Sequence, residues 1–353
     1  MALDACPACA AAVAPTDRFC EACGQDLAAA AGSVAPEPVA AAGRWLTSAV
    51  APATCPSCGG ASFGAEGYCE DCGQRRGSGQ DHTELDLDGI AAVTDKGLRH
   101  HRNEDAVGIG VLADAVIGIV CDGVSTSSRP DTASHSAVEA AITALVGSLD
   151  RHTEAADAIG TAARAAQAAA TLAAGAHPGS NPPASTFVCA VVAHDRVTVG
   201  WVGDSRAYWL PDVLPDAGAD SATLPAPACL TVDDSLAGQA AARGVSLPAG
   251  LRPPQAAALV RWLGADAPEV VPHVQSFVPT GPGRVLVCSD GLFRYRPAAA
   301  DLAASTPPGR PLATAQALVN LALDAGGSDN IAVAVLPYPP PALTVPQSTE
   351  ESS

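Results

Sequence analysis

The stretch AVIGIVCDGVSTSS, residues 115–128, joins an apolar run to an acid, a glycine and a string of hydroxyl residues. Asp-Gly is among the commonest hairpin pairs, so a simple turn accounts for Asp122 and Gly123 when the dipeptide is taken alone. A functional interpretation requires that other apolar strands of the chain also end in acids. The rest of the sequence decides between the two interpretations.

Composition excludes several classes of partner. The chain has 353 residues, 48% of them hydrophobic, which is enough for one large domain and smaller units. It contains no run of about 18 apolar residues, and its start, MALDACPACA, lacks the regions of a signal peptide. We therefore expect a cytoplasmic protein without a membrane partner. The formal net charge of -18 argues against nucleic acid, whose binding depends on Lys and Arg.

Twelve cysteines in a cytoplasmic chain require an explanation other than disulfides. Eight of them form two repeats, each with ten residues between two CxxC pairs: Cys6, Cys9, Cys20 and Cys23, then Cys55, Cys58, Cys69 and Cys72. Two such pairs complete a tetrahedral thiolate site that leaves no position open for water, so we expect two structural Zn²⁺ ions. The units resemble zinc ribbons. Because neither has a basic face, we expect them to contact protein or to act as spacers.

Composition also suggests the domain boundaries. We predict zinc ribbons at 1–27 and 54–76, an Ala/Pro-rich linker at 28–53 and a second linker at 77–86. Residues 87–337 are predicted to form one domain, and the Pro-rich residues 338–353 a disordered tail.

Residues 87–337 alternate Val/Ile-rich runs with Ala-rich stretches. Strands are predicted in AAVTD, AVGIGVL, AVIGIVCDG, STFVCAVVAHD, RVTVGWVGDSRAYWL, RVLVCSDG and NIAVAVLP. Helices are predicted at 132–149, 154–173, 235–244, 254–263 and 311–325. Strands that cluster around a helical pair favour an α+β fold with antiparallel sheets.

Acids recur at the ends of these predicted strands. They occupy five strand ends: Glu104 and Asp105 together, then Asp122, Asp204, Asp290 and Asp329. Five independent solvated turns would explain them without function, but glycines adjoin several of them and all lie where side chains can project into a shared cleft. Carboxylates suit Mg²⁺ or Mn²⁺, and several of them together require cations, so the pattern favours a site for two hard metal ions.

Eight segments occur in the order of a known motif series: TDKGLRHHRNEDA, VCDGVSTSS, ASTFVCAVV, WVGDSRAYWL, LTVDDSL, RWLGADAP, CSDGLFRY and GGSDNIAVAVLP. They are distributed along nearly the whole length of residues 87–337 and resemble the metal-dependent serine/threonine protein phosphatases, the PPM family or type 2C, particularly its bacterial members. The resemblance implies a β-sandwich of two antiparallel sheets flanked by α-helices. It also implies a signalling enzyme that acts on phosphorylated proteins, among them serine/threonine kinases and their substrates.

The resemblance further implies roles for individual residues. Asp122 would bridge two Mn²⁺ or Mg²⁺ ions, Gly123 would offer its carbonyl, and Glu104 would serve the second ion with support from Asp105. Asp290 and Asp329 would hold the first ion, and Asp204 with Asp290 would bind a third. The attacking group would be a water activated between two ions, which requires no covalent phosphoenzyme. Ser205 and Asn330 are interpreted as loop-shaping.

Two departures from the family pattern concern the substrate. His100 stands where the family usually has an Arg that clamps phosphate, so an imidazole replaces a permanently charged fork. Arg99 and Arg102 flank it as candidate substitutes. Val124 follows Gly123 where eukaryotic relatives have a His. The alternative hypothesis is a catalytically weak pseudophosphatase or sensor that binds proteins, but the principal metal acids are all present, which favours an enzyme.

Overall fold

The computed structural model describes residues 43–48, 62, 70–71, 81–87, 89–175, 179–213, 223–224, 226–248, 250–267 and 270–341. They all belong to one compact unit, Ala42–Ser353, and the unit Met1–Ala41 lies outside them. The eight cysteines of the predicted zinc sites also lie outside the described residues, as does the predicted tail beyond Pro341. No helix in the described ranges is both long and apolar enough to cross a membrane.

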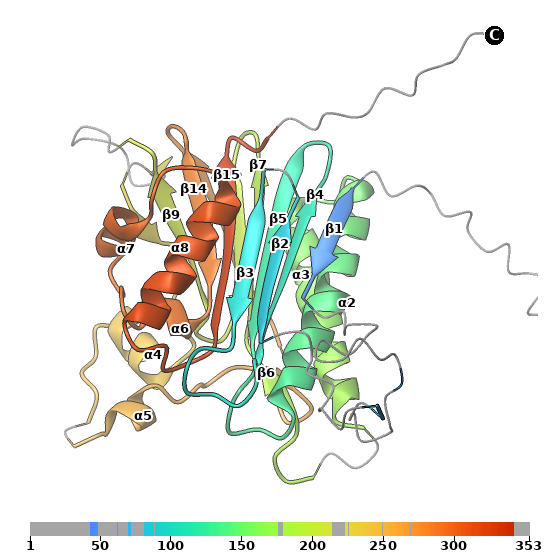
Figure 1. Ribbon diagram of the computed structural model, residues 1–353, viewed down its shortest axis with the longest axis vertical. Coiled ribbons are helices and arrows are strands. Elements are labelled where there is room, and N and C mark those ends of the chain that lie inside the picture. The colour runs from blue at the N-terminus through green and yellow to red at the C-terminus, as the bar shows by residue number, and fades with distance from the viewer. Residues whose placement is uncertain are drawn as a thin grey trace, which may run out of the picture. The chain divides into compact units, whose positions relative to one another are not determined.

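Two large sheets form the centre of the unit (Figure 1). The seven-stranded sheet has the order β1-β4-β5-β7-β8-β13-β10. Its strands are β1 (Arg44–Thr47), β4 (Asp105–Val111), β5 (Ala115–Asp122), β7 (Phe187–Ala193), β8 (Val197–Val202), β13 (His273–Pro279) and β10 (Thr223–Leu224). Neighbouring strands are antiparallel except β10 and β13.

The six-stranded sheet is antiparallel throughout, in the order β11-β9-β14-β15-β3-β2. Its strands are β11 (Ala228–Cys229), β9 (Arg206–Pro211), β14 (Gly283–Cys288), β15 (Ile331–Tyr338), β3 (Ala91–Asp95) and β2 (His82–Asp86). β6 (Ala184–Ser185) and β12 (Leu263–Gly264) form a separate two-stranded sheet, and Ser185 bridges to Gly123 directly after β5.

Three apolar clusters hold the layers together. The first fills the space between the sheets, where Trp201 and Trp209 are among the largest buried side chains. The second packs α2 (Pro130–Asp150) and α3 (Ala155–Ala173) on the outer face of the seven-stranded sheet. The third packs α6 (Asp290–Phe293), α7 (Ala299–Ser305) and α8 (Pro311–Asp324) on the six-stranded sheet, so helices cover both faces of the sandwich (Figure 1). This is the α+β sandwich expected from the sequence.

The Ala-rich pattern predicts most of the helices, but one predicted helix is too long and two short helices are missed. α2, α3 and α8 lie where predicted, as does α4 (Leu236–Ala242). The helix predicted at 254–263 is only α5 (Pro253–Ala256), since the following residues form a loop and β12. The short α6 and α7 were not predicted, because four to seven residues give too little periodicity to recognise.

The predicted linkers require correction. Residues 44–47 of the predicted linker 28–53 form β1 at the edge of the seven-stranded sheet, and residues 82–86 of the predicted linker 77–86 form β2 at the edge of the other. The domain therefore includes residues before Leu87, and it extends to Tyr338 in β15. Both strands are edge strands with mostly exposed side chains, so they lack the buried alternating pattern that identifies a strand.

A second correction concerns RVTVGWVGDSRAYWL, which was predicted as one strand stretch. The chain leaves β8 at Gly203, whose φ is 106°, and enters β9 at Arg206, so the two strands lie in different sheets. A Cβ on Gly203 would lie 2.8 Å from Thr186 Cβ, so both the backbone conformation and the close approach require glycine. Asp204 lies in this connection, where the chain passes from one sheet to the other.

Candidate active site

The predicted metal acids converge at one end of the sandwich. Asp122, Asp204, Asp290 and Asp329 line a single cavity of about 480 Å³ together with Gly123. Asp122 ends β5, Asp290 follows β14, and Asp329 precedes β15. Since β5 belongs to one sheet and β14 and β15 to the other, the packing of the two sheets against each other brings these acids together.

Asp122 is held by the backbone and the side chain of Thr186, the residue directly before β7. Its amide donates to Thr186 Oγ1 at 3.0 Å, and the Thr186 amide donates to the Asp122 carbonyl at 2.7 Å. Thr186 Oγ1 lies 2.7 Å from Ser205 Oγ, so Ser205 shapes this loop as expected. A Cβ on Gly123 would lie 2.7 Å from the Pro130 backbone and 2.8 Å from the Glu104 carbonyl oxygen. Only glycine fits here, which answers the question raised by the Asp-Gly pair.

Glu104 and Asp105 come from the start of β4. Asp105 is fully buried opposite Asp122 in the β4–β5 register, and its Oδ2 accepts a 2.6 Å hydrogen bond from Ser289 Oγ. The Glu104 amide donates to Asn330 Oδ1 at 2.8 Å. Asn330 also donates to the carbonyls of Lys96 and Arg102, so this buried amide ties the loop before β4 to β15.

The carboxylates disfavour one another's ionisation. Burial, and then the charge of Asp105, raises the pKa of Asp122 well above its ordinary value. Burial also raises the pKa of Asp105 well above its ordinary value, against the hydrogen bond from Ser289. Burial and the charge of Asp290 raise the pKa of Asp204 to about 7. Burial and Asp290 also raise the pKa of Asp329, although Arg294 and His100 oppose the shift. A divalent cation would relieve this repulsion.

The donor set fits a hard metal ion. Glu104 Oε2 and Asp105 Oδ1 are buried oxygens without a hydrogen-bond partner, and Gly123 lets the backbone approach the cavity closely. The predicted ligands are carboxylate and carbonyl oxygens, with no sulfur or imidazole among them, and such donors suit Mg²⁺ or Mn²⁺. As placed, no three His, Cys, Asp or Glu side chains in the described ranges are gathered closely enough to hold an ion. The fit therefore rests on the shared cavity, the unpartnered oxygens and the mutual repulsion.

Cations lie beside these acids. Arg102 Nε donates to Glu104 Oε1 at 3.0 Å, and Arg102 Nη1 lies 3.5 Å from Asp131 Oδ1. His100 Nε2 lies 3.0 Å from Asp329 Oδ1, whereas Arg99 is exposed. Arg294, which sequence reasoning missed, contacts two predicted metal ligands through one nitrogen: Nη2 lies 2.6 Å from Asp290 Oδ2 and 2.8 Å from Asp329 Oδ2. Its spacing of four residues from Asp290 was the available signal.

The segment LTVDDSL, residues 230–236, is anchored to both sheets, although none of its residues lines the cavity. Arg206 of β9 binds Asp233 through two hydrogen bonds of 2.8 and 2.7 Å, and its guanidinium stacks 3.9 Å from the centre of the Phe293 ring. Asp234 accepts from the Gly203 amide at 3.2 Å, and its Oδ1 lies 3.0 Å from His273 Nε2. These anchors fix the start of the chain that leads to α4 and α5.

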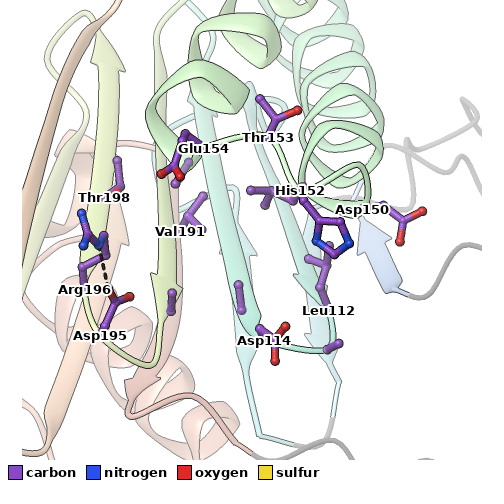
Figure 2. A pocket seen from close by; sticks show the side chains of 15 residues that line it. Leu112, Asp114, Asp150, His152, Thr153, Glu154, Val191, Asp195, Arg196 and Thr198 are labelled. Atoms are coloured by element: carbon purple, nitrogen blue, oxygen red, sulfur yellow. Dashed lines mark hydrogen bonds and ion pairs between the residues drawn. The ribbon is translucent and has the colours of Figure 1, made fainter.

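A second, larger cavity of about 580 Å³ is lined by none of the predicted metal acids (Figure 2). The turns after β4, α2 and β7 form it, with Asp114, His152 and Arg196 among its residues. The β4–β5 turn is the opposite end of these strands from Asp105 and Asp122, and none of the predicted site residues lines this cavity. The predicted chemistry belongs to the smaller cavity.

Comparison with known proteins agrees with this architecture. Residues 98–213 match the model for protein phosphatase 2C, and residues 6–73 match the double zinc ribbon. The serine/threonine phosphatase PstP/Ppp of Mycobacterium tuberculosis is 25% identical, with a TM-score of 0.54 over 70% of this chain and 96% of that chain. The PPM Ser-Thr phosphatase MsPP of Mycobacterium smegmatis, solved with cacodylate, is 28% identical, with a TM-score of 0.54 over 71% and 98%.

A further structure is the catalytic domain of PstP in complex with two manganese ions, which is 25% identical with a TM-score of 0.53 over 70% of this chain and 96% of that chain. Comparison with curated protein sequences finds no match.

Proposed function

We propose, from the premise that this chain carries a serine/threonine phosphatase domain of the PPM family (type 2C), that it hydrolyses phosphoserine and phosphothreonine in proteins. The observation that carries the proposal is the convergence of Asp122, Asp204, Asp290 and Asp329 on one cavity. The cavity lies at a sheet end that also presents Glu104 and Asp105. The alternative, a weak pseudophosphatase that binds proteins, is an outcome of the experiment below.

Asp122 would serve two Mn²⁺ or Mg²⁺ ions, and Gly123 would offer its backbone carbonyl. Asp290 and Asp329 would hold the first ion, and Glu104 would serve the second. Asp204 and Asp290 would form a weaker third site. Bound ions would supply an activated water and would neutralise phosphoryl charge. The two manganese ions in PstP support this assignment.

Several side chains have the positioning role. Asn330 holds the backbone of Glu104, and Ser289 holds Asp105 against Asp122. Thr186 holds the amide of Asp122. Each of these contacts is buried or partly buried and links an acid to a residue distant in the sequence. The contacts would therefore orient the acids before substrate arrives.

The zinc ribbons would serve as docking modules for protein substrates. The described residues on either side of the second cysteine repeat, Ser48 and His82, both lie at the sheet end that carries the acids. Ser48 exchanges hydrogen bonds with Val107, two residues beyond Asp105, and His82 is in register with Asp95 and hence with Ile331, two residues beyond Asp329. The described chain on both sides of the second repeat therefore lies at the sheet end that carries the acids.

Hydrolysis of p-nitrophenyl phosphate and of a phosphothreonine peptide tests the proposal. The full chain would be assayed with Mn²⁺, with Mg²⁺ and with EDTA, beside Asp122→Asn and the exposed control Asp114→Asn. We expect metal-dependent turnover that Asp122→Asn reduces at least a hundredfold and Asp114→Asn leaves unchanged, since Asp114 lies at the opposite end of β5.

The result that overturns the proposal is Mn²⁺ binding at the acids, measured by calorimetry and lost in Asp122→Asn, without turnover of either substrate. That outcome would favour the protein-binding alternative. Turnover that persists in EDTA and in Asp122→Asn would contradict the metal assignment.

A further inference from the structure

A phosphoryl group needs cations beside it, yet the cavity supplies none of its own. In the described chain, no Lys, Arg or His is among the residues that line it, whereas Asp122, Asp204, Asp290 and Asp329 are. The phosphate monoester is a dianion at neutral pH and would face four carboxylates. Metal ions offset part of this charge, and a protein cation at the cavity edge would supply hydrogen bonds and orientation.

Arg294 is placed to act on this cavity. Its Nη2 lies within 2.8 Å of both Asp290 Oδ2 and Asp329 Oδ2, and both of these carboxylates line the cavity. The side chain is 42% exposed, and the hydrogen bonds of Nη1 and Nη2 are themselves exposed, so a ligand can reach the guanidinium. Nη1 makes only a 3.4 Å contact with Ser328 Oγ, which leaves N–H groups available.

The base of Arg294 is fixed. Its amide donates to the Asp290 carbonyl at 2.9 Å, which closes the single turn of α6. A Cβ on Gly291 would clash with the Asn330 carbonyl oxygen, so this turn packs directly on the residue before β15. The neighbouring Phe293 lies under the guanidinium of Arg206. The turn therefore carries Arg294 on the same rigid support as Asp290.

The other two nearby cations are placed differently. Arg102 contacts Glu104 and Asp131, neither of which lines the cavity. His100 contacts the same carboxylate as Arg294, but at Asp329 Oδ1 rather than Oδ2. His100 and Arg294 thus meet around one carboxylate, and of the two only Arg294 has a permanent charge and a bidentate fork.

We propose that Arg294 binds the phosphoryl oxygens of the substrate, so that α6 supplies the guanidinium that the loop before β4 lacks at His100. This inference rests on the proposed phosphatase function and deepens it. Arg294 donates N–H groups to the phosphoryl group, while the contact with Asp290 and Asp329 keeps the guanidinium at the cavity edge.

The test measures phosphate affinity separately from catalysis. Inorganic phosphate would be titrated by calorimetry into the full chain saturated with Mn²⁺, and Mn²⁺ affinity would be measured on the same samples. We expect Arg294→Gln to raise the phosphate Kd tenfold to a hundredfold, the usual effect of losing a hydrogen bond between charged groups, and Arg294→Lys to raise it less. The control is Arg296→Gln, since Arg296 contacts Ser305 and the Tyr295 carbonyl instead.

Restoration of the charge at the other position sharpens the test. If the two positions share one role, the double variant Arg294→Gln with His100→Arg regains phosphate affinity. An unchanged phosphate Kd in a folded Arg294→Gln protein overturns the proposal. So does a loss of Mn²⁺ affinity with unchanged phosphate affinity at saturating Mn²⁺, because Arg294 would then only position metal ligands. Because binding is measured without turnover, an inactive wild type would contradict the phosphatase function without deciding this result.

Discussion

Asp204 shows how strongly an acid of the proposed metal site depends on its environment. It is placed between the sheets, and burial with the nearby charge of Asp290 raises its pKa to about 7. An acid whose pKa is raised by folding destabilises the folded state as pH rises above its ordinary pKa of about 3.8, and the loss is complete above pH 7. In the metal-free protein, Asp204 therefore lowers the free energy of unfolding more at pH 8 than at pH 5.

Asp204→Asn removes this cost. In EDTA we expect the Tm of the variant to exceed that of the wild type at pH 8, by about 2 to 4 °C for each kcal/mol recovered, and the difference to shrink at pH 5. Differential scanning calorimetry at the two pH values measures it, with the exposed Asp114→Asn as control. Equal Tm differences at both pH values would contradict the assigned pKa.

At the scale of the element, β1 shows how a short edge strand is held. Ser48 follows it directly and is 2% exposed; its amide donates to the Val107 carbonyl and its Oγ accepts from the Val107 amide, each at 2.9 Å. The side chain thus completes the ladder where the strand ends. Removing the hydroxyl leaves a buried N–H without this acceptor.

We expect Ser48→Ala to lower the free energy of unfolding by about 1 to 3 kcal/mol. Urea denaturation measures the loss, with Thr143→Ala on the exposed face of α2 as the control, since Thr143 donates only to a carbonyl of its own helix. A loss of less than about 0.5 kcal/mol would mean that β1 contributes little to the sheet.

At the scale of the whole molecule, the boundary of the catalytic unit falls before β1. The unit Ala42–Ser353 includes Arg44–Thr47, which pairs with β4, so these residues between the two cysteine repeats belong to the seven-stranded sheet. Deleting residues 1–41 should leave the Tm of the catalytic unit and its turnover of p-nitrophenyl phosphate unchanged. Deleting residues 1–81 should lower the Tm, because β1 is lost.

Calorimetry of the two truncated proteins beside the full chain compares these cases. A Tm lowered equally by both deletions would show that residues 1–41 also stabilise the catalytic unit. Full retention of the Tm after deletion of residues 1–81 would show that β1 is dispensable.

Much of this protein was determined by the sequence itself. Buried strands such as β4 and β5 are rich in Val and Ile and need a core on both sides, and Ala-rich helices of 14 to 21 residues are long enough to recognise. Acids at strand ends predicted a shared cavity, since a carboxylate at the end of a strand lies at the end of the sheet. Local chemistry alone was sufficient for these features.

The tertiary structure decided the rest, because it depends on contacts between residues distant in sequence. Edge strands β1 and β2 expose most side chains, so only their partners β4 and β3 reveal them. The division of β8 from β9 between two sheets places Asp204 beside Asp290. Arg294 became a candidate phosphate ligand only when α6 and β15 brought its guanidinium to Asp290 and Asp329 together, a convergence that no local pattern encodes.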